Sequence, residues 1–267
     1  MGIPTITERK HYRLVPGEPE EPTSTIVLTS KDSYFVDVRI YKDKHEEEIG
    51  KETNTKECID WAFAGRSHTT PHGARKDGMI QLSHTVWEHW IDSKSNNPGP
   101  DEGDMLVQED GDVLERGMQK HPVTGADTEY EELWHDLEVD AFGKKQNRSS
   151  LVLKAEQPES DIRGVAIKIG GWCQGILKAG DALTIERWEW KASGPNNGET
   201  SVEGGEQAAR TSNGWVRTFR YGEGSLPCEE MCDRTTGKFG LNAVIKRQLD
   251  AGLESEIEWK VIEEYYW

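Results

Sequence analysis

The chain has 267 residues, which is enough for one large domain or two small ones with a proper core. Its 49 acidic and 32 basic side chains give a formal net charge of −17, and this acidity argues against nucleic-acid binding. Only 34% of the residues are hydrophobic, but ten Trp, seven Tyr and five Phe favour a folded protein over a disordered one.

Short runs rich in β-branched and aromatic residues, separated by Gly, Pro, Asn and Asp, predict an all-β protein. In chain order, the predicted strands are Thr25–Thr29, Tyr34–Tyr41, Cys58–Ala64, Met79–Ile91, Asp112–Gly117, Thr128–Leu137, Ser150–Lys154, Gly164–Ile169, Leu183–Lys191, Trp215–Tyr221 and Glu256–Tyr265. The apolar residues of Leu241–Leu253 follow helical spacing instead, so we expect one short helix there, near the C-terminus. Evenly spaced strands of this kind indicate a barrel or a sandwich.

The polar segment Asp140–Ser149 divides the predicted strands into two sets. Each set spans roughly 120–140 residues, enough for a small barrel. We therefore predict two domains, residues 1–145 and 146–267.

Strand periodicity places aromatic residues on shared faces, which favours an organic-ligand cavity inside a barrel. One predicted face holds Trp87, His89 and Ile91, and another holds Trp215, Arg217, Phe219 and Tyr221. The candidate substrate-binding residues are Trp61, Phe63, Trp87, Trp90, Trp134, Trp172, Gln174, Trp188 and Trp215. The candidate catalytic residues are His89, Arg217 and His84, because polar groups without partners are out of place in a dry core. The alternative is that these Trp rings only fill cores.

Several other site types receive no support from the sequence. The eight His lack the local spacing of metal ligands, and no phosphate-binding or dinucleotide motif occurs, so we expect no metal and no cofactor. The string Gly171-Trp172-Cys173-Gln174-Gly175 resembles a nucleophile elbow, but no helix follows it, which favours a turn between antiparallel strands.

No apolar run approaches the ~20 residues of a membrane span, and the first thirty residues lack the apolar core of a secretory signal. The four Cys are few and unpatterned, as in a reducing compartment, and Cys228 and Cys232 are expected to be surface-loop thiols. We therefore expect a cytoplasmic protein without membrane contacts.

Five strings occur in an order that resembles the fungal HRI-type family. They are Asp60-Trp61-Ala62-Phe63-Ala64-Gly65, His89-Trp90-Ile91-Asp92, Glu132-Leu133-Trp134, Gly171-Trp172-Cys173-Gln174-Gly175 and Glu258-Trp259-Lys260-Val261-Ile262-Glu263. The resemblance implies two consecutive lipocalin-like antiparallel β-barrels, and the family's yeast member is named for association with a casein kinase. The chain is also similar to cofactor-free hetero-Diels–Alderases of fungal tropolone–sesquiterpenoid pathways, although no catalytic residue is carried over from them.

The aromatic faces and this similarity predict a cofactor-free cyclase or pericyclase acting on a hydrophobic natural-product intermediate. The similarity implies an intermolecular hetero-Diels–Alder reaction of a tropolone o-quinone methide with a macrocyclic sesquiterpene. Holding two reactants in a reactive pose can supply about 7–11 kcal/mol. His89 or Arg217 would polarise the tropolone carbonyl. Two alternatives stay open: a non-catalytic adaptor that binds a protein partner, and a carrier of a hydrophobic metabolite.

The absence of metal-ligand spacing gives a first prediction. Treatment with EDTA or with a reductant should leave the far-UV circular dichroism spectrum and the melting temperature unchanged, because structural zinc or disulfides would otherwise contribute to folding directly. Loss of secondary structure in EDTA would contradict it.

Overall fold

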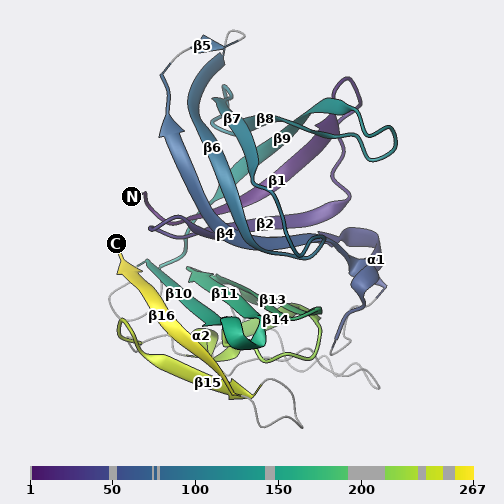
Figure 1. The fold of residues 1–267 in the computed structure, drawn as a ribbon. Helices are drawn as coiled ribbons and strands as arrows, with labels where there is room; N and C mark the ends of the chain where they lie inside the picture. The colour runs from purple at the N-terminus through teal and green to yellow at the C-terminus, as the bar shows by residue number, and fades with distance from the viewer. Residues whose placement is uncertain are drawn as a thin grey trace, which may run out of the picture.

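The computed structural model describes residues 2–47, 53–73, 75–76, 79–141, 148–191, 214–233, 239–248 and 256–267. Two antiparallel sheets dominate them and lie one above the other (Figure 1). The first sheet contains β1 (Thr5–Leu14), β2 (Thr23–Thr29), β3 (Tyr34–Tyr41), β4 (Ile59–Pro71), β5 (Arg75–Lys76), β6 (Met79–Asp92), β7 (Asp101–Val107), β8 (Val113–Lys120) and β9 (Asp127–Leu137). A short helix, α1 (Lys42–Glu46), follows β3, and a 3-10 turn, Lys56–Cys58, precedes β4.

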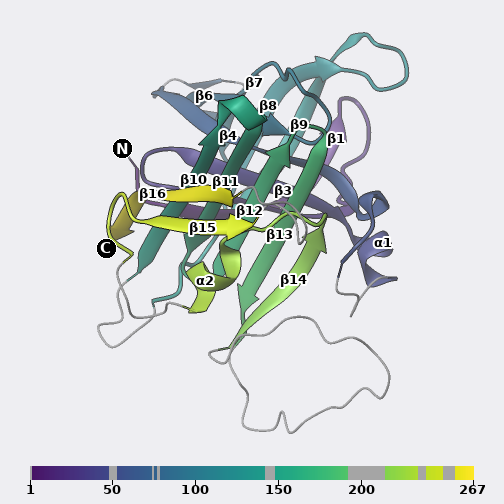
Figure 2. The ribbon, with the colours of Figure 1, turned by 60° about the horizontal axis from the view of Figure 1, so that its bottom comes forward.

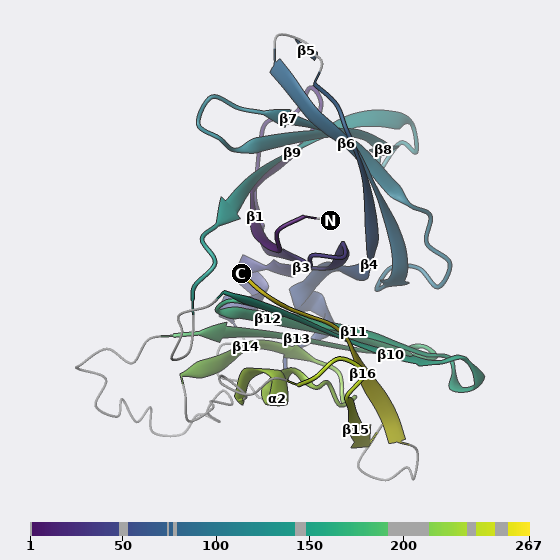
Figure 3. The same cartoon turned by 90° about the vertical axis from the view of Figure 1, so that its left-hand side faces the viewer.

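The first sheet closes into a barrel. Its strand order is β4-β3-β2-β1-β9-β8-β7-β6-β5. A further pairing between β4 and β6 closes the barrel, which contains eight strands because β5 pairs only with β6 outside the ring. The view along the barrel in Figure 3 shows this closure.

The second sheet curls into a half-barrel beneath the first (Figures 2 and 3). It contains β10 (Ser149–Gln157), β11 (Ile162–Ile169), β12 (Trp172–Ala179), β13 (Ala182–Trp190), β14 (Trp215–Tyr221), β15 (Val244–Gln248) and β16 (Glu256–Tyr266), in the order β14-β13-β12-β11-β10-β16-β15. A 3-10 turn, Pro158–Ser160, links β10 to β11, and helix α2 (Cys228–Asp233) packs against β11, β12 and β13.

The all-β class with a barrel architecture and a short helix near the C-terminus is confirmed, but the helix is α2 and not the predicted segment. Within Leu241–Leu253, residues Val244–Gln248 form β15, paired antiparallel with β16, and residues 249–253 lie outside the described ranges. Side chains of β15 alternate between exposed and half-buried, which is the period of a strand. The short Val-Ile run fits both periods, and pairing with β16 decides between them.

Strands β1, β5, β7, β12 and β15 were not among the predicted strands. The first sheet ends at Leu137 and the second begins at Ser149, while the predicted boundary at residue 145 lies outside the described residues. Cys228 and Cys232 are fully buried in α2, so their prediction as surface-loop thiols is wrong. Packing of α2 onto the concave side of the half-barrel removes both thiols from solvent.

The apolar core lies mostly outside the first barrel, between its outer wall and the convex face of the second sheet. Aliphatic side chains of β1, β2 and β3 and of β10, β11, β12 and β13 meet there: Ile6, Ile26, Leu28, Val36, Val38, Ile40, Val152, Val165, Ile167, Ile176 and Ile185. A second core fills the concave side of the half-barrel around Trp188, Trp215 and Trp259, under α2. The two sheets are therefore packed on each other through a large aliphatic layer.

Two buried polar side chains cross this aliphatic layer. The Gln174 amide donates to the carbonyl oxygens of Ile26 and Val36 at 3.0 and 3.1 Å and accepts from Arg187 Nε at 2.8 Å. Arg187 in turn donates to the Ser24 hydroxyl at 2.9 Å and to the Val38 carbonyl at 2.6 Å. The bonds to Ile26, Val36, Ser24 and Val38 join the second sheet to the first, and the bond between Arg187 and Gln174 holds the two side chains together. Gln174 has no exposed surface, so water does not compete for its bonds.

Replacing Gln174 should therefore destabilise the whole molecule. We expect Gln174→Ala to lower the free energy of unfolding by about 2–3 kcal/mol, because it leaves the Arg187 guanidinium short of an acceptor in a dry interface. Urea denaturation followed by tryptophan fluorescence measures this loss. The matched control is Gln157→Ala, whose exposed amide bonds only to the Glu256 carbonyl and whose removal should cost less than about 0.5 kcal/mol. Equal losses in both variants would contradict the structural role of Gln174.

Candidate functional site

A network of charged side chains lies inside the first barrel. Arg39 of β3 donates to Asp37 Oδ2 at 2.9 Å and to Glu132 Oε1 of β9 at 2.9 Å, and Arg9 of β1 contacts the same Glu132 oxygen at 2.5 Å. Strands β3 and β9 are separated in the sheet by β2 and β1, so the contact between Arg39 and Glu132 crosses the concave side. These charges therefore face the barrel interior.

The carboxyl groups of this network are perturbed by burial. Burial and the neighbouring charge of Glu132 raise the pKa of Glu115 to about 8, although Tyr130 and Trp134 donate hydrogen bonds to it at 2.7 and 2.9 Å. Burial also raises the pKa of Asp37, against the opposing effect of Arg39. The second oxygen of Asp37, Oδ1, is buried and has no hydrogen-bond partner among the described residues. It is a buried acceptor that the described side chains leave unsatisfied.

Aromatic rings lie beside the charged network. Trp61 and Phe63 of β4 are 4.4 Å apart by their ring centroids, and the His89 ring of β6 stacks on Phe63 at 4.2 Å. The guanidinium of Arg39 lies 5.2 Å from the Trp61 ring and 5.3 Å from the Phe63 ring. The structure thus gathers three predicted residues, Trp61, Phe63 and His89, and places Arg39 beside the rings of Trp61 and Phe63.

His89 is held by two carboxylates. Its Nδ1 lies 3.1 Å from Asp92 Oδ2, which also accepts from Trp61 Nε1 at 3.0 Å, and its Nε2 lies 3.3 Å from Asp101 Oδ2. Burial disfavours the charged imidazolium and by itself lowers the pKa of His89. The hydrogen bonds and charges of Asp101 and Asp92 outweigh this effect and raise the pKa to about 9. His89 is therefore an imidazolium at neutral pH.

Some side chains inside the first barrel keep part of their surface exposed. Thr7 and Val27 share the face of Asp37, and Met105 shares the face of Glu115, because cross-strand partners point to the same side. All three remain half-buried, whereas the outward-facing Ile6, Ile26 and Leu28 are fully buried. Solvent therefore reaches Thr7, Val27 and Met105 more readily than the apolar residues of the outer wall.

The other predicted residues of the first barrel occupy different positions. Trp134 lies inside, donating to Glu115, and Trp87 is half-buried on the same strand as His89. Trp90 packs against the layer between the sheets, and Lys154 Nζ lies 4.1 Å from the centroid of its ring. His84 lies 2.9 Å from Asp104 and is not among the contacts of His89. These positions leave Trp90 and His84 outside the cluster of Trp61, Phe63 and His89.

Two irregular strand pairings correct the predicted shared faces. A register shift between Ala64 and Gly65 adds one residue to β6, so Ile91 joins the core between the sheets while His89 faces inward. Another shift, at Arg187 and Trp188, divides β14, with Trp215 in the concave core and Phe219 in the layer between the sheets. Bulges of this kind reverse the alternation beyond them.

The predicted residues of the second sheet lie apart from this cluster. Trp188 and Trp215 are core residues of the half-barrel, and Arg217 lies 5.8 Å from the Trp188 ring and 3.8 Å from Glu186, so the structure does not bring Arg217 to His89. Trp172 and Gln174 belong to the layer between the sheets. Of the string Gly171-Trp172-Cys173-Gln174-Gly175, in which a turn between antiparallel strands is expected, only Gly171 lies in the turn between β11 and β12, and the other four residues belong to β12.

Sequence reasoning missed the charged residues inside the barrel: Arg9, Asp37, Arg39, Glu115 and Glu132. The signal was the alternation in Tyr34–Tyr41, where Asp37 and Arg39 stand between Val36, Val38 and Ile40. Charges at every second position of a strand that is buried on both faces indicate an internal polar network.

The described part of the chain offers no metal centre and no membrane helix. Its His, Cys, Asp and Glu side chains form no group of three or more that could hold a metal ion. Its helices are too short and too polar to cross a lipid bilayer.

Comparison with known proteins places this geometry in a family. The family model described as Protein HRI1 matches residues 5–263. Protein HRI1 of Saccharomyces cerevisiae strain S288c is 25% identical over 206 residues, covering 69% of this chain and 78% of the relative, and the same protein of strain YJM789 gives equal values. A crystal structure of an uncharacterized Saccharomyces cerevisiae protein aligns over 99% of this chain and 100% of its own, with a TM-score of 0.64 and 19% identity.

The two carboxylates beside His89 give a prediction for its titration. We expect Asp101→Asn to lower the pKa of His89 from about 9 toward its ordinary value near 6.5, because one of the two stabilising charges is removed. In the native protein the raised pKa stabilises the fold fully below pH ~6.5, and this contribution is lost as pH rises through about 9.

Two-dimensional NMR of the imidazole signals across pH 5–10 measures this titration. The control Asp112→Asn removes the carboxylate beside His135 instead and should leave the His89 titration as it is. An unchanged His89 midpoint in Asp101→Asn would contradict the role of Asp101.

Proposed function

The chain belongs to the HRI1 family, and we propose that it binds a small organic molecule inside its first barrel. The observation that carries the proposal is the buried Asp37 Oδ1, which has no hydrogen-bond partner in the described part of the chain and lies beside the Arg39 guanidinium, itself next to the rings of Trp61 and Phe63. A buried acceptor without a donor costs about 1–3 kcal/mol, which a ligand donor can recover.

The lining determines the chemistry of the ligand. Planar unsaturated rings pack well against Trp61 and Phe63, because aromatic side chains offer large flat apolar surfaces. A hydroxyl on the same molecule can donate to Asp37 Oδ1, and a carbonyl can accept from Arg39 or from a protonated Glu115. The network of charges disfavours a purely aliphatic guest, whose binding would bury these groups without new partners. The proposed ligand is therefore a hydroxylated, conjugated ring of the tropolone or phenol type.

Catalysis of a cyclisation stays a prediction beyond binding. His89 carries a proton at neutral pH, which suits a donor that polarises a carbonyl, but its two nitrogens already face Asp92 and Asp101. Arg217 lies on the other sheet and His84 pairs with Asp104. Incubation of the protein with an o-quinone methide precursor and a macrocyclic terpene tests it: a product distribution equal to that in buffer would exclude catalysis.

The adaptor alternative also stays a prediction. An adaptor would use exposed surface, and its binding to a protein partner would be insensitive to substitutions inside the barrel. Substitutions inside the barrel therefore distinguish ligand binding from an adaptor function.

Binding of tropolone and of 2-naphthol tests the proposed function. We expect both to quench tryptophan fluorescence in a saturable way, and Trp61→Leu to weaken the affinity about tenfold because the stacking surface is lost. The control Trp190→Leu changes a half-buried ring of the second sheet and should leave the affinity unchanged. Circular dichroism establishes that both variants fold. Absence of saturable binding, or equal weakening in both variants, would overturn the proposal.

A further inference from the structure

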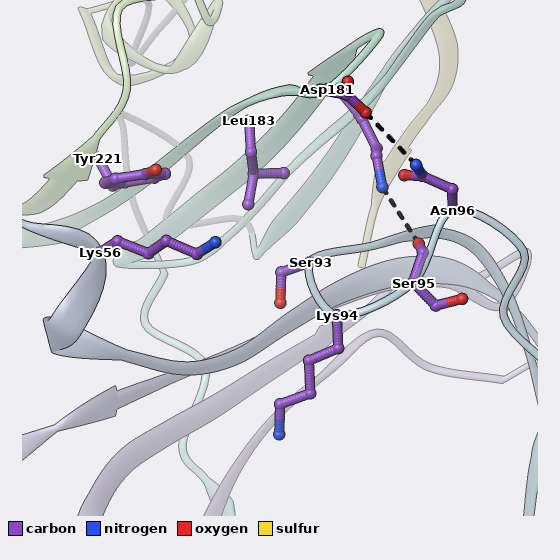
Figure 4. A pocket seen from close by; sticks show the side chains of 9 residues that line it. Lys56, Ser93, Lys94, Ser95, Asn96, Asp181, Leu183 and Tyr221 are labelled. Carbon is purple, nitrogen blue, oxygen red and sulfur yellow. Dashed lines mark hydrogen bonds between the residues drawn. The ribbon is translucent and has the colours of Figure 1, made fainter.

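A cavity lies between the first barrel and the second sheet, away from the barrel interior. It has a volume of about 170 Å³ and is lined from the first barrel by Lys56 and by the Ser93–Asn96 segment after β6. From the second sheet it is lined by Lys178, Asp181, Leu183 and Tyr221 (Figure 4). Three lysines thus surround one small cavity in a protein of net charge −17.

Lys178 is the buried cation of this cavity. The residue is only 6% exposed, and its ammonium donates to the carbonyl oxygens of Asp92 and Ser95 at 2.9 and 3.1 Å. An ammonium has three N–H donors, so these bonds leave one unused. No carboxylate of the described residues lies within 4 Å of it, and its cross-strand partner on β11 is another cation, Arg163.

Lys56 supplies a second charge from the opposite wall. Its side chain extends across the cavity toward the side of Leu183 and Ser93, as Figure 4 shows. It forms no ion pair with any described carboxylate. Lys94 contributes less, because its ammonium lies 4.7 Å from the Trp61 ring and 3.5 Å from Asp60. Two ammonium groups from different sheets, Lys56 and Lys178, are therefore available to one guest.

We propose that this cavity binds a small oxyanion, a phosphate or a carboxylate, between Lys56 and Lys178. Its volume is below the ~300–1,000 Å³ of pockets for drug-sized ligands, so the guest is an ion or a metabolite of a few heavy atoms. The hydroxyls of Ser93 and Tyr221 lie on the lining and can donate to further oxygens.

The remaining polar groups limit where an anion can lie in the cavity. Asp181 accepts from the Asn96 amide at 3.4 Å, so its carboxylate repels an anion from that side. Ser93 already accepts from the backbone N–H of Ala62 at 2.9 Å, which leaves its hydroxyl proton free to donate. The favoured position is therefore between the Lys56 and Lys178 ammonium groups, beside the Ser93 hydroxyl.

Occupancy would link the two sheets. Lys56 and Ser93 belong to the first barrel, while Lys178 and Tyr221 belong to the second sheet, so an anion held by all of them adds contacts across the interface. Such a ligand binds the folded protein only, and it therefore raises the melting temperature with the logarithm of its concentration once that exceeds Kd.

Isothermal titration calorimetry with inorganic phosphate, acetate and sulfate, at constant ionic strength set with sodium chloride, tests the proposal. We expect saturable phosphate binding that Lys56→Ala weakens about tenfold, because a charge-assisted hydrogen bond is lost. Lys178→Gln should weaken it at least as much. The control Lys246→Ala removes an exposed lysine of β15 that pairs with Glu256 and Glu258 of β16. The phosphate affinity of this variant should match that of the native protein.

The three anions distinguish the ligand class. Tighter binding of phosphate than of acetate assigns the cavity to phosphorylated compounds, and the reverse order assigns it to carboxylates. If Lys178→Gln does not fold, Lys56→Ala and the NMR shift of the Tyr221 ring on phosphate addition decide the matter. No saturable binding by any of the anions, or equal affinity in Lys56→Ala and the native protein, would overturn the proposal.

Discussion

A buried arginine joins the two sheets, and the rest of the architecture depends on it. Arg187 has no carboxylate partner within 4 Å among the described residues, and its charge is instead solvated by Gln174, Ser24 and the Val38 carbonyl. Burial lowers the pKa of Arg187 to about 10, so it stays charged at neutral pH. Aliphatic contacts between the sheets are non-directional, whereas these bonds fix one angle and one register. The carboxylate of Glu263 acts similarly from β16, accepting from the Ser30 hydroxyl and the backbone N–H of Asp32.

This interface explains why the interior of the first barrel is polar. An isolated small barrel buries its apolar side chains inside, but here the apolar face of β2 and β3 points outward and is covered by the second sheet. The hydrophobic stabilisation of the barrel is thus obtained on its outer wall, so its interior can hold Arg9, Arg39 and Glu132. Pairing these charges with one another lowers the free-energy cost of burying them.

The sequence predicts most strands because β-branched alternation is a local property, but the arrangement inside the barrel is not local. Arg39 and Glu132 are 93 residues apart, and alternation shows only that Asp37 and Arg39 share a face, not that this face is inside a barrel. The bulge near Trp90 reverses the alternation by one residue and cannot be read from composition. In the string Gly171-Trp172-Cys173-Gln174-Gly175, the sequence suggests a turn or a nucleophile, while the structure gives the residues packing roles. Gln174 crosses the interface, and a Cβ at Gly175 would lie 2.8 Å from Cys228 Sγ.

One residue connects the barrel interior with the cavity between the sheets. The carboxylate of Asp92 accepts from Trp61 Nε1 and faces His89 inside the barrel, and it also accepts from the backbone N–H groups of Lys94 and Ser95. Its carbonyl oxygen accepts from Lys178. A substitution of Asp92 would therefore disturb the aromatic cluster and the cavity together, so its effect could not be attributed to either place. Trp61 and Lys56 each touch one of the two places, so substitutions of these two side chains separate ligand binding in the barrel from anion binding between the sheets.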